Sequence, residues 1–135
     1  MPDWDGEDLT GWNSKPLLHV ATTGRRTGER RKKWWLVFAV LPEVIYLIEE
    51  RGTRADWVRN IIAEPRVKIR VDGGEELDAR ARVVTEPYEA ERAKGAVRGT
   101  DIGRTLADLI EWGQPVAIEP ARAESARATG GTTPA

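Results

Sequence analysis

Apolar and polar residues alternate along several short segments of the chain, a pattern typical of strands with one buried face. The clearest case is Val67, Ile69 and Val71, which alternate with charged residues and precede the hairpin signal Asp72-Gly73-Gly74. Similar reasoning predicts six strands, at residues 17–23, 30–41, 44–49, 67–71, 75–84 and 116–119.

Residues 30–41 form the longest of these predicted strands. They begin with four cations and continue with residues that are apolar on both faces. Strands of this kind are usually buried on both sides. We therefore expect a central strand that is covered on both faces.

Three segments carry helical signals. Residues 55–63 place Val58, Ile61 and Ile62 on one apolar stripe, and Thr53 with Asp56 predicts a capping box in front of it. A second helix is expected up to residue 99, with proline in its first turn, and a third at residues 101–112.

The predicted order of elements is β-β-β-α-β-β-α-α-β, dominated by antiparallel hairpins. Closing the sheet removes its exposed edges. We therefore predict an α+β, mainly β, single domain: a six-stranded antiparallel split β-barrel with flanking helices at residues 17–120. Residues 1–16 would form an N-terminal arm, and residues 121–135, which contain almost no large apolar side chains, a disordered tail.

Composition narrows the chemistry. The 135 residues include no cysteine and a single histidine, His19, so thiolate metal sites, a cysteine nucleophile and a Ser-His-Asp triad are not expected. The absence of cysteine also favours a cytoplasmic location. The net charge is -1, with 21 basic and 22 acidic residues. A chain with this balance is not expected to bind nucleic acid, so a local basic cluster indicates a compact anionic ligand.

The strongest local signal is a glycine-bracketed turn, Gly24-Arg25-Arg26-Thr27-Gly28, followed by Arg30-Arg31-Lys32-Lys33. Glycine allows the chain to reverse tightly, and successive amides in such a turn can bind an anion. Arginine suits phosphate and carboxylate. The pattern predicts a site for an extended polyanion, although a merely solvated basic turn is an equally ordinary interpretation.

Two adjacent tryptophans, Trp34 and Trp35, follow the cations. Neighbouring strand residues face opposite ways, so the two rings cannot lie on the same face. We expect one to fill the core and the other to border a flat ligand or an interface.

Several motifs occur together in order: residues 22–28 with Arg31, then Trp57-x-x-Asn60, Ala63-x-Pro65-x-Val67 and residues 115–120. In this the chain resembles the deazaflavin (F420)-dependent nitroreductase and quinone reductase family, within the flavin-reductase-like split β-barrel group. The resemblance covers residues 17–120.

The resemblance implies coenzyme F420, a deazaflavin with a phosphate and a polyglutamate tail. It also implies hydride transfer from the reduced cofactor to a quinone, a nitro compound or an activated alkene. It identifies no catalytic residue and no metal site. The cofactor-binding residues that it implies are Arg25, Arg26, Thr27, Gly28, Arg31, Lys32, Lys33, Trp34, Trp35, Leu36, Asp56, Trp57 and Asn60.

Two departures from the family pattern bear on activity. A small Gly-rich loop is replaced by the acidic Glu49-Glu50-Arg51-Gly52, and the late tyrosines are missing, leaving only Tyr46 and Tyr88. The alternatives are a non-catalytic carrier of F420 or of an apolar ligand, and the same fold using FMN. The expected partner is a small hydrophobic electron acceptor. Peripheral membrane contact through tryptophans, and a monomer or a homodimer, stay open.

Overall fold

Seven antiparallel strands form one curled sheet in the computed structural model, which describes residue 4 and residues 7–121. The strand order is β2-β1-β5-β6-β7-β4-β3. The strands are β1 (Leu18–Thr23), β2 (Arg30–Trp35), β3 (Phe38–Val40), β4 (Ile45–Glu49), β5 (Arg66–Val71), β6 (Leu77–Val83) and β7 (Gln114–Pro120). The predicted class is confirmed, but the strand count is seven and not six.

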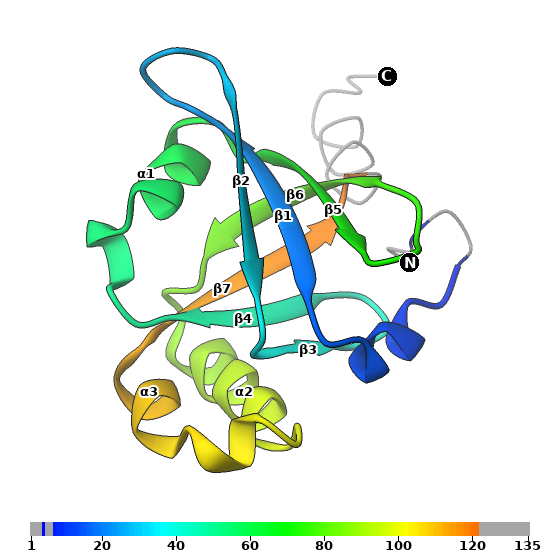
Figure 1. Ribbon diagram of the computed structural model, residues 1–135. Coiled ribbons are helices and arrows are strands. Elements are labelled where there is room, and N and C mark those ends of the chain that lie inside the picture. Colours follow the sequence, from blue (N-terminus) through cyan, green and yellow to red (C-terminus); the bar gives the residue numbers. More distant parts are fainter. Residues whose placement is uncertain (1–3, 5–6, 122–135) are drawn as a thin grey trace, which may run out of the picture.

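The extra strand arises because residues 30–41 are not one continuous strand. The chain leaves β2 after Trp35 and re-enters the sheet as β3 at Phe38. β2 pairs with β1, whereas β3 pairs with β4 at the opposite end of the strand order. This one bent segment therefore joins the two ends of the sheet and curls it into a barrel (Figure 1).

The prediction of a central strand covered on both faces is wrong for β2. It lies at an end of the strand order, and residues 30–34 are exposed. Within residues 30–41, only the β3 part of the segment is a strand buried on both faces. The tryptophans suggested a core strand, but four consecutive cations cannot be buried without partners.

The barrel interior is filled by every second residue of the strands. Leu18 and Val20 of β1 meet Phe38, Leu47, Ile69 and Ile118 in one buried cluster. Trp4 and Leu9 join this cluster, so the described part of the predicted arm packs against the barrel; it includes the 3-10 helix η1 (Thr10–Ser14). The predicted tail at residues 122–135 lies outside the described residues.

Three helices flank the barrel. α2 (Pro87–Arg98) and α3 (Ala107–Trp112) cover the outer face of β3, β4 and β7 through a second buried cluster that includes Tyr46, Val97 and Ile110. α1 (Asp56–Ala63) lies beside the β1–β2 hairpin, on another side of the molecule (Figure 1). None of the described helices is long and apolar enough to cross a membrane.

Local structure around α1 and α3 differs from the sequence-based expectation. Thr53 lies in a 3-10 turn, η2 (Gly52–Arg54), and α1 starts after Ala55 without a side-chain cap. The capping box is therefore absent, because the Asp56 carboxylate contacts Arg25 instead. The helix predicted at residues 101–112 divides into η3 (Gly103–Thr105) and the shorter α3.

Candidate functional site

A cavity of about 640 Å³ opens between the β1–β2 hairpin and α1. It brings together two parts of the sequence that lie about thirty residues apart. The residues that line it are Gly24, Arg25, Arg26, Thr27, Arg30, Arg31, Lys32, Lys33, Asp56, Trp57 and Asn60.

The turn at the head of the hairpin is held by its own backbone. The Gly24 amide donates to the Glu29 carbonyl at 2.7 Å, and the Gly28 amide donates to the Gly24 carbonyl at 2.8 Å. Gly28 has φ 74°, a conformation that favours glycine. Because the Gly24 and Gly28 amides already donate hydrogen bonds within the turn, an anion bound by the backbone would have to accept from the amides of Arg26 and Thr27.

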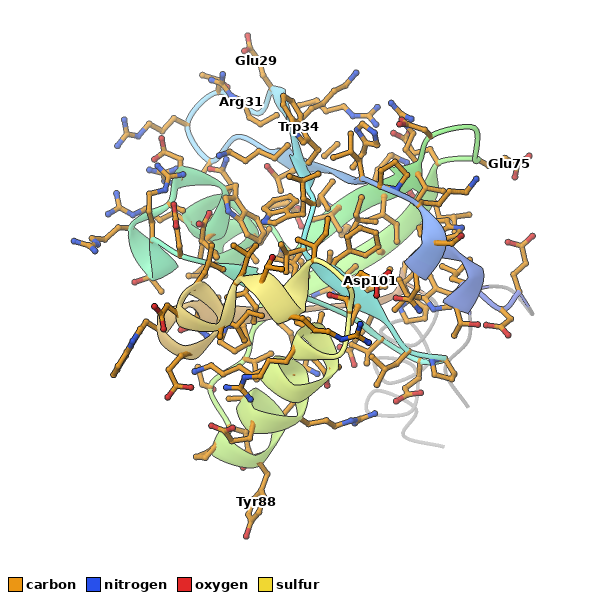
Figure 2. The ribbon with its side chains drawn as sticks, turned by 60° about the horizontal axis from the view of Figure 1, so that its bottom comes forward. Glu29, Arg31, Trp34, Glu75, Tyr88 and Asp101 are labelled. Carbon is orange, nitrogen blue, oxygen red and sulfur yellow. The ribbon has the colours of Figure 1, made fainter. Side chains whose placement is uncertain are left out.

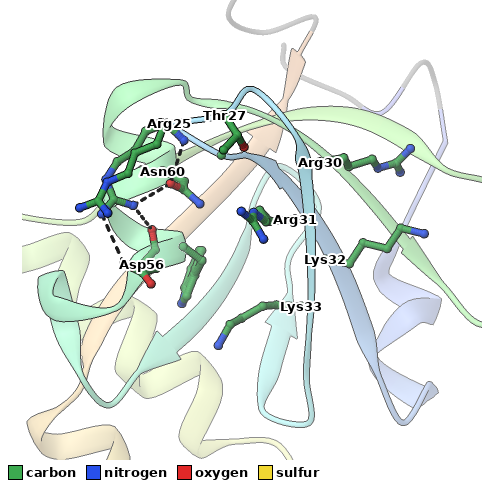
Figure 3. A pocket seen from close by; sticks show the side chains of 11 residues that line it. Arg25, Thr27, Arg30, Arg31, Lys32, Lys33, Asp56 and Asn60 are labelled. Carbon is green, nitrogen blue, oxygen red and sulfur yellow. Dashed lines mark hydrogen bonds and ion pairs between the residues drawn. The ribbon is translucent and has the colours of Figure 1, made fainter.

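Arg25 connects this turn to α1. Its guanidinium donates to Asn60 Oδ1 at 2.9 Å and contacts Asp56 Oδ1 at 3.3 Å. Its backbone amide also donates to Asn60 Oδ1, at 3.1 Å. Asn60 is only 5% exposed, so this buried amide oxygen is satisfied by a single residue. Arg25 therefore fixes the position of the turn against the helix (Figure 3).

The cations of β2 divide between two faces of the strand. Arg31 and Lys33 point to the side of the cavity and α1, whereas Arg30 and Lys32 point to the other side (Figure 3). Arg30 forms an ion pair with Glu76. Over the part of the chain that the structure describes, Arg26, Arg31, Lys32 and Lys33 have no ion-pair partner.

An aromatic pair stands at the inner side of the cavity, where Trp57 lines it. Trp35 is half-buried, does not line the cavity, and meets Trp57 edge-on, with ring centroids 4.5 Å apart and an interplanar angle of 65°. Trp34 is 64% exposed and does not line the cavity. The expectation that one ring faces the core is met by Trp35, which packs against the interior cluster.

Glu49 holds this pair in place. Trp57 Nε1 donates to Glu49 Oε1 at 2.6 Å, and the Arg51 amide donates to the other carboxylate oxygen at 3.2 Å. Glu49 is 8% exposed, whereas Glu50 is exposed. Sequence reasoning did not include Glu49 in the site. The sequence signal that could have identified it is a carboxylate at the end of an otherwise apolar strand.

Four of the residues that sequence reasoning placed in the site do not line the cavity. They are Gly28, Trp34, Trp35, which packs against Trp57, and Leu36, which lies in a separate groove between η1, β3 and the end of α2. Figure 2 shows Trp34 near Arg31, while Tyr88 projects from the opposite end of the molecule. Within the described chain, no group of three or more His, Asp or Glu side chains could hold a metal ion.

Comparisons with known proteins indicate the family and the fold of the chain. A family model described as F420H(2)-dependent quinone reductase matches residues 3–101. No curated protein sequence matches the chain.

Solved structures show the same fold at low sequence identity. HutZ, the heme storage protein from Vibrio cholerae, has 16% identity and a TM-score of 0.65, with 83% of this chain and 87% of that chain covered. An F420-H2 dependent reductase, FDR-A, has 20% identity and a TM-score of 0.59, over 77% and 93%. A third, described as a domain-swapped dimer, has 18% identity and a TM-score of 0.60, over 77% and 80%.

The family model spans well over half of the chain, including the whole hairpin, the turn and α1. The chain belongs to the F420H(2)-dependent quinone reductase family.

Proposed function

We propose that this protein binds coenzyme F420 in the cavity between the β1–β2 hairpin and α1 and acts as an F420H2-dependent reductase. The observation that carries the proposal is a group of unpaired cations beside a tryptophan. Arg26, Arg31 and Lys33 border the cavity without ion-pair partners in the described chain, and Trp57 lines it. These residues fit a ligand with an anionic tail and a flat ring.

Each part of the cavity has a distinct task in this proposal. Arg26, Arg31 and Lys33 bind the phosphate and carboxylates, and Trp57, packed against Trp35, borders the ring. Arg25 and Glu49 do not contact the ligand but position the turn and Trp57. When bound, reduced F420 supplies a hydride for the acceptor.

The acceptor in this proposal is a hydrophobic molecule such as a quinone. The chain supplies orientation and a partly dry surface, which together lower the barrier for transfer to an acceptor held next to the ring. We assign no acid or base, because the described residues of the cavity offer only cations, Asp56 and Asn60 besides Trp57 and Thr27.

Titration with oxidised F420, followed by tryptophan fluorescence, tests cofactor binding. We expect quenching and an affinity that weakens as salt rises, because the tail contacts are ionic. Arg26→Glu with Arg31→Glu should abolish binding while the far-UV circular dichroism spectrum is unchanged. If this double variant binds as tightly as the parent, the site assignment is wrong.

A non-catalytic carrier of F420 is the second candidate. Neither tyrosine of the chain could donate a proton at the cavity: Tyr46 is buried against Glu89, and Tyr88 is 88% exposed on α2. Turnover of menadione with reduced F420 would exclude the carrier. Tight binding of F420 without turnover of any quinone would support it, and a yellow protein on purification would instead indicate FMN.

We further propose a homodimer as the assembly to test. The support is that one protein of the same fold is described as a domain-swapped dimer. Sedimentation equilibrium distinguishes the dimer from the monomer, which has a mass of 15.1 kDa.

A further inference from the structure

We infer that the cavity selects a cofactor tail of limited charge: affinity rises with the first few anionic groups of the tail and stops rising at about four. This inference rests on the proposed function, because it concerns F420 at the same site. It follows from the way in which the chain distributes paired and unpaired cations.

The unpaired cations around the cavity are few. Arg26, Arg31 and Lys33 border its inner side, and Lys32 is the remaining unpaired cation on β2. Together they carry four positive charges that no described carboxylate neutralises. An anionic tail can gain a charge-assisted contact from each of them.

Cations beyond this group are already neutralised on the outer face of the sheet. Arg30 is paired with Glu76, and Lys68 with Asp78 at 2.5 Å. Two further pairs extend the same pattern along β5: Arg66–Glu64 at 2.7 Å and Arg70–Asp72 at 3.6 Å.

On the α1 side, the described residues offer no further unpaired cation in the lining of the cavity, because Arg59 lies outside it. Arg25 is engaged by Asp56 and Asn60, and Arg59 Nε donates to the Thr53 carbonyl at 3.1 Å. Asp56 is largely exposed at this rim, with 83% of its side chain accessible. It would repel a carboxylate that extended in this direction.

A tail carboxylate that reaches a paired cation must compete with the carboxylate already there. The exchange replaces one exposed ion pair by another, and such pairs differ little in free energy. Each added glutamate beyond the unpaired group therefore contributes almost nothing to affinity, whereas each of the first few contributes a new contact.

The test is a series of F420 forms that differ only in the number of tail glutamates, together with the tail-free deazaflavin that lacks the phosphate. Dissociation constants are measured by tryptophan fluorescence at constant low salt. We expect affinity to rise from the tail-free compound through the short tails and then stay constant to within about twofold. A steady rise with every added glutamate would overturn the inference.

Two variants show whether ion pairing sets this limit. Glu76→Gln frees Arg30, so the plateau should move to a longer tail and long-tailed forms should bind more tightly than in the parent. Arg70→Gln, the control, removes a paired cation of the outer face and should leave every dissociation constant unchanged. A plateau unmoved by Glu76→Gln would contradict the inference.

Failure of the proposed function gives a different result. In that case no form of F420, short or long, binds at low salt. If the forms bind but the tail-free compound binds as tightly as the others, F420 is a ligand and the charge limit is wrong.

Discussion

Two adjacent arginines of the turn have different tasks. The Arg25 guanidinium makes three hydrogen bonds to α1, to Asn60 and to the carbonyl and carboxylate of Asp56, whereas Arg26 has no described partner. The sequence alone gives both the same environment, Gly-Arg-Arg-Thr-Gly. Their roles diverge because Asn60, thirty-five residues later, is folded against only one of them.

Substitution of these two arginines should therefore separate stability from binding. Arg25→Met removes the guanidinium contacts to Asn60 and Asp56 and leaves only the residue-25 backbone amide on the buried Asn60 oxygen, so we expect a loss of about 1–2 kcal/mol in the free energy of unfolding. Arg26→Met should leave stability within about 0.5 kcal/mol of the parent but weaken F420 binding. Urea unfolding and fluorescence titration measure the two effects. Equal losses of stability in both variants would contradict the division of roles.

At the scale of elements, the sequence predicts strands better than their places in the sheet. The alternation of Val67, Ile69 and Val71 identifies β5, because side-chain period follows from local geometry. The interruption at Leu36–Val37 could not be predicted from local sequence. It depends on long-range pairing, because β2 pairs with β1 whereas β3 pairs with β4. The hydrogen bond from Trp57 to Glu49 could not be predicted from local sequence either, because a carboxylate at the end of a strand is normally solvated.

Gly113 joins α3 to β7 at a point where the chain packs too closely against Ile48 and Leu109 to admit a side chain. A Cβ at Gly113 would lie 2.2 Å from Ile48 Cγ2 and 2.7 Å from the Leu109 carbonyl oxygen. Gly113→Ala should therefore push α3 away from β4 and reduce the free energy of unfolding by about 1–3 kcal/mol. Chemical denaturation followed by circular dichroism measures this loss.

Gly95, in the middle of α2, is the matched control for that substitution. A Cβ at Gly95 meets no atom within 4 Å. Gly95→Ala should stabilise the protein by about 0.5–1 kcal/mol, because alanine favours the helix and loses less entropy on folding. If both glycine variants are destabilised alike, steric contact at Gly113 is not the cause.

At the scale of the whole molecule, a partly buried polar network connects helix α2 to the barrel. The Tyr46 hydroxyl of β4 donates to Glu89 Oε2 at 2.8 Å, and Arg82 of β6 donates to both Glu89 oxygens at 2.8 Å. Burial, and then the Glu89 carboxylate, raises the pKa of Tyr46 to about 12. Hydrogen bonds from Arg82 hold the pKa of Glu89 below its usual range.

These two pKa shifts predict that the fold loses stability both in acid, through Glu89, and in alkali, through Tyr46. The lowered pKa of Glu89 stabilises the fold above the unfolded pKa of about 4.3, and this contribution is lost as the pH falls through the folded value. The raised pKa of Tyr46 stabilises the fold below pH about 10, and its contribution is lost as the pH rises towards 12.

Tyr46→Phe tests the alkaline half of this prediction. The variant keeps the ring in the core but removes the ionisable hydroxyl, so its denaturation midpoint should fall less than that of the parent between pH 10 and 12. At neutral pH we expect a loss of about 0.5–1.5 kcal/mol from the missing hydrogen bond. Glu89 keeps Arg82, the main cause of its lowered pKa, but loses the hydrogen bond from Tyr46, so the acid loss of stability should become smaller without disappearing. Parallel alkaline curves for the two proteins would show that Tyr46 does not link the α2 layer to the barrel through its proton.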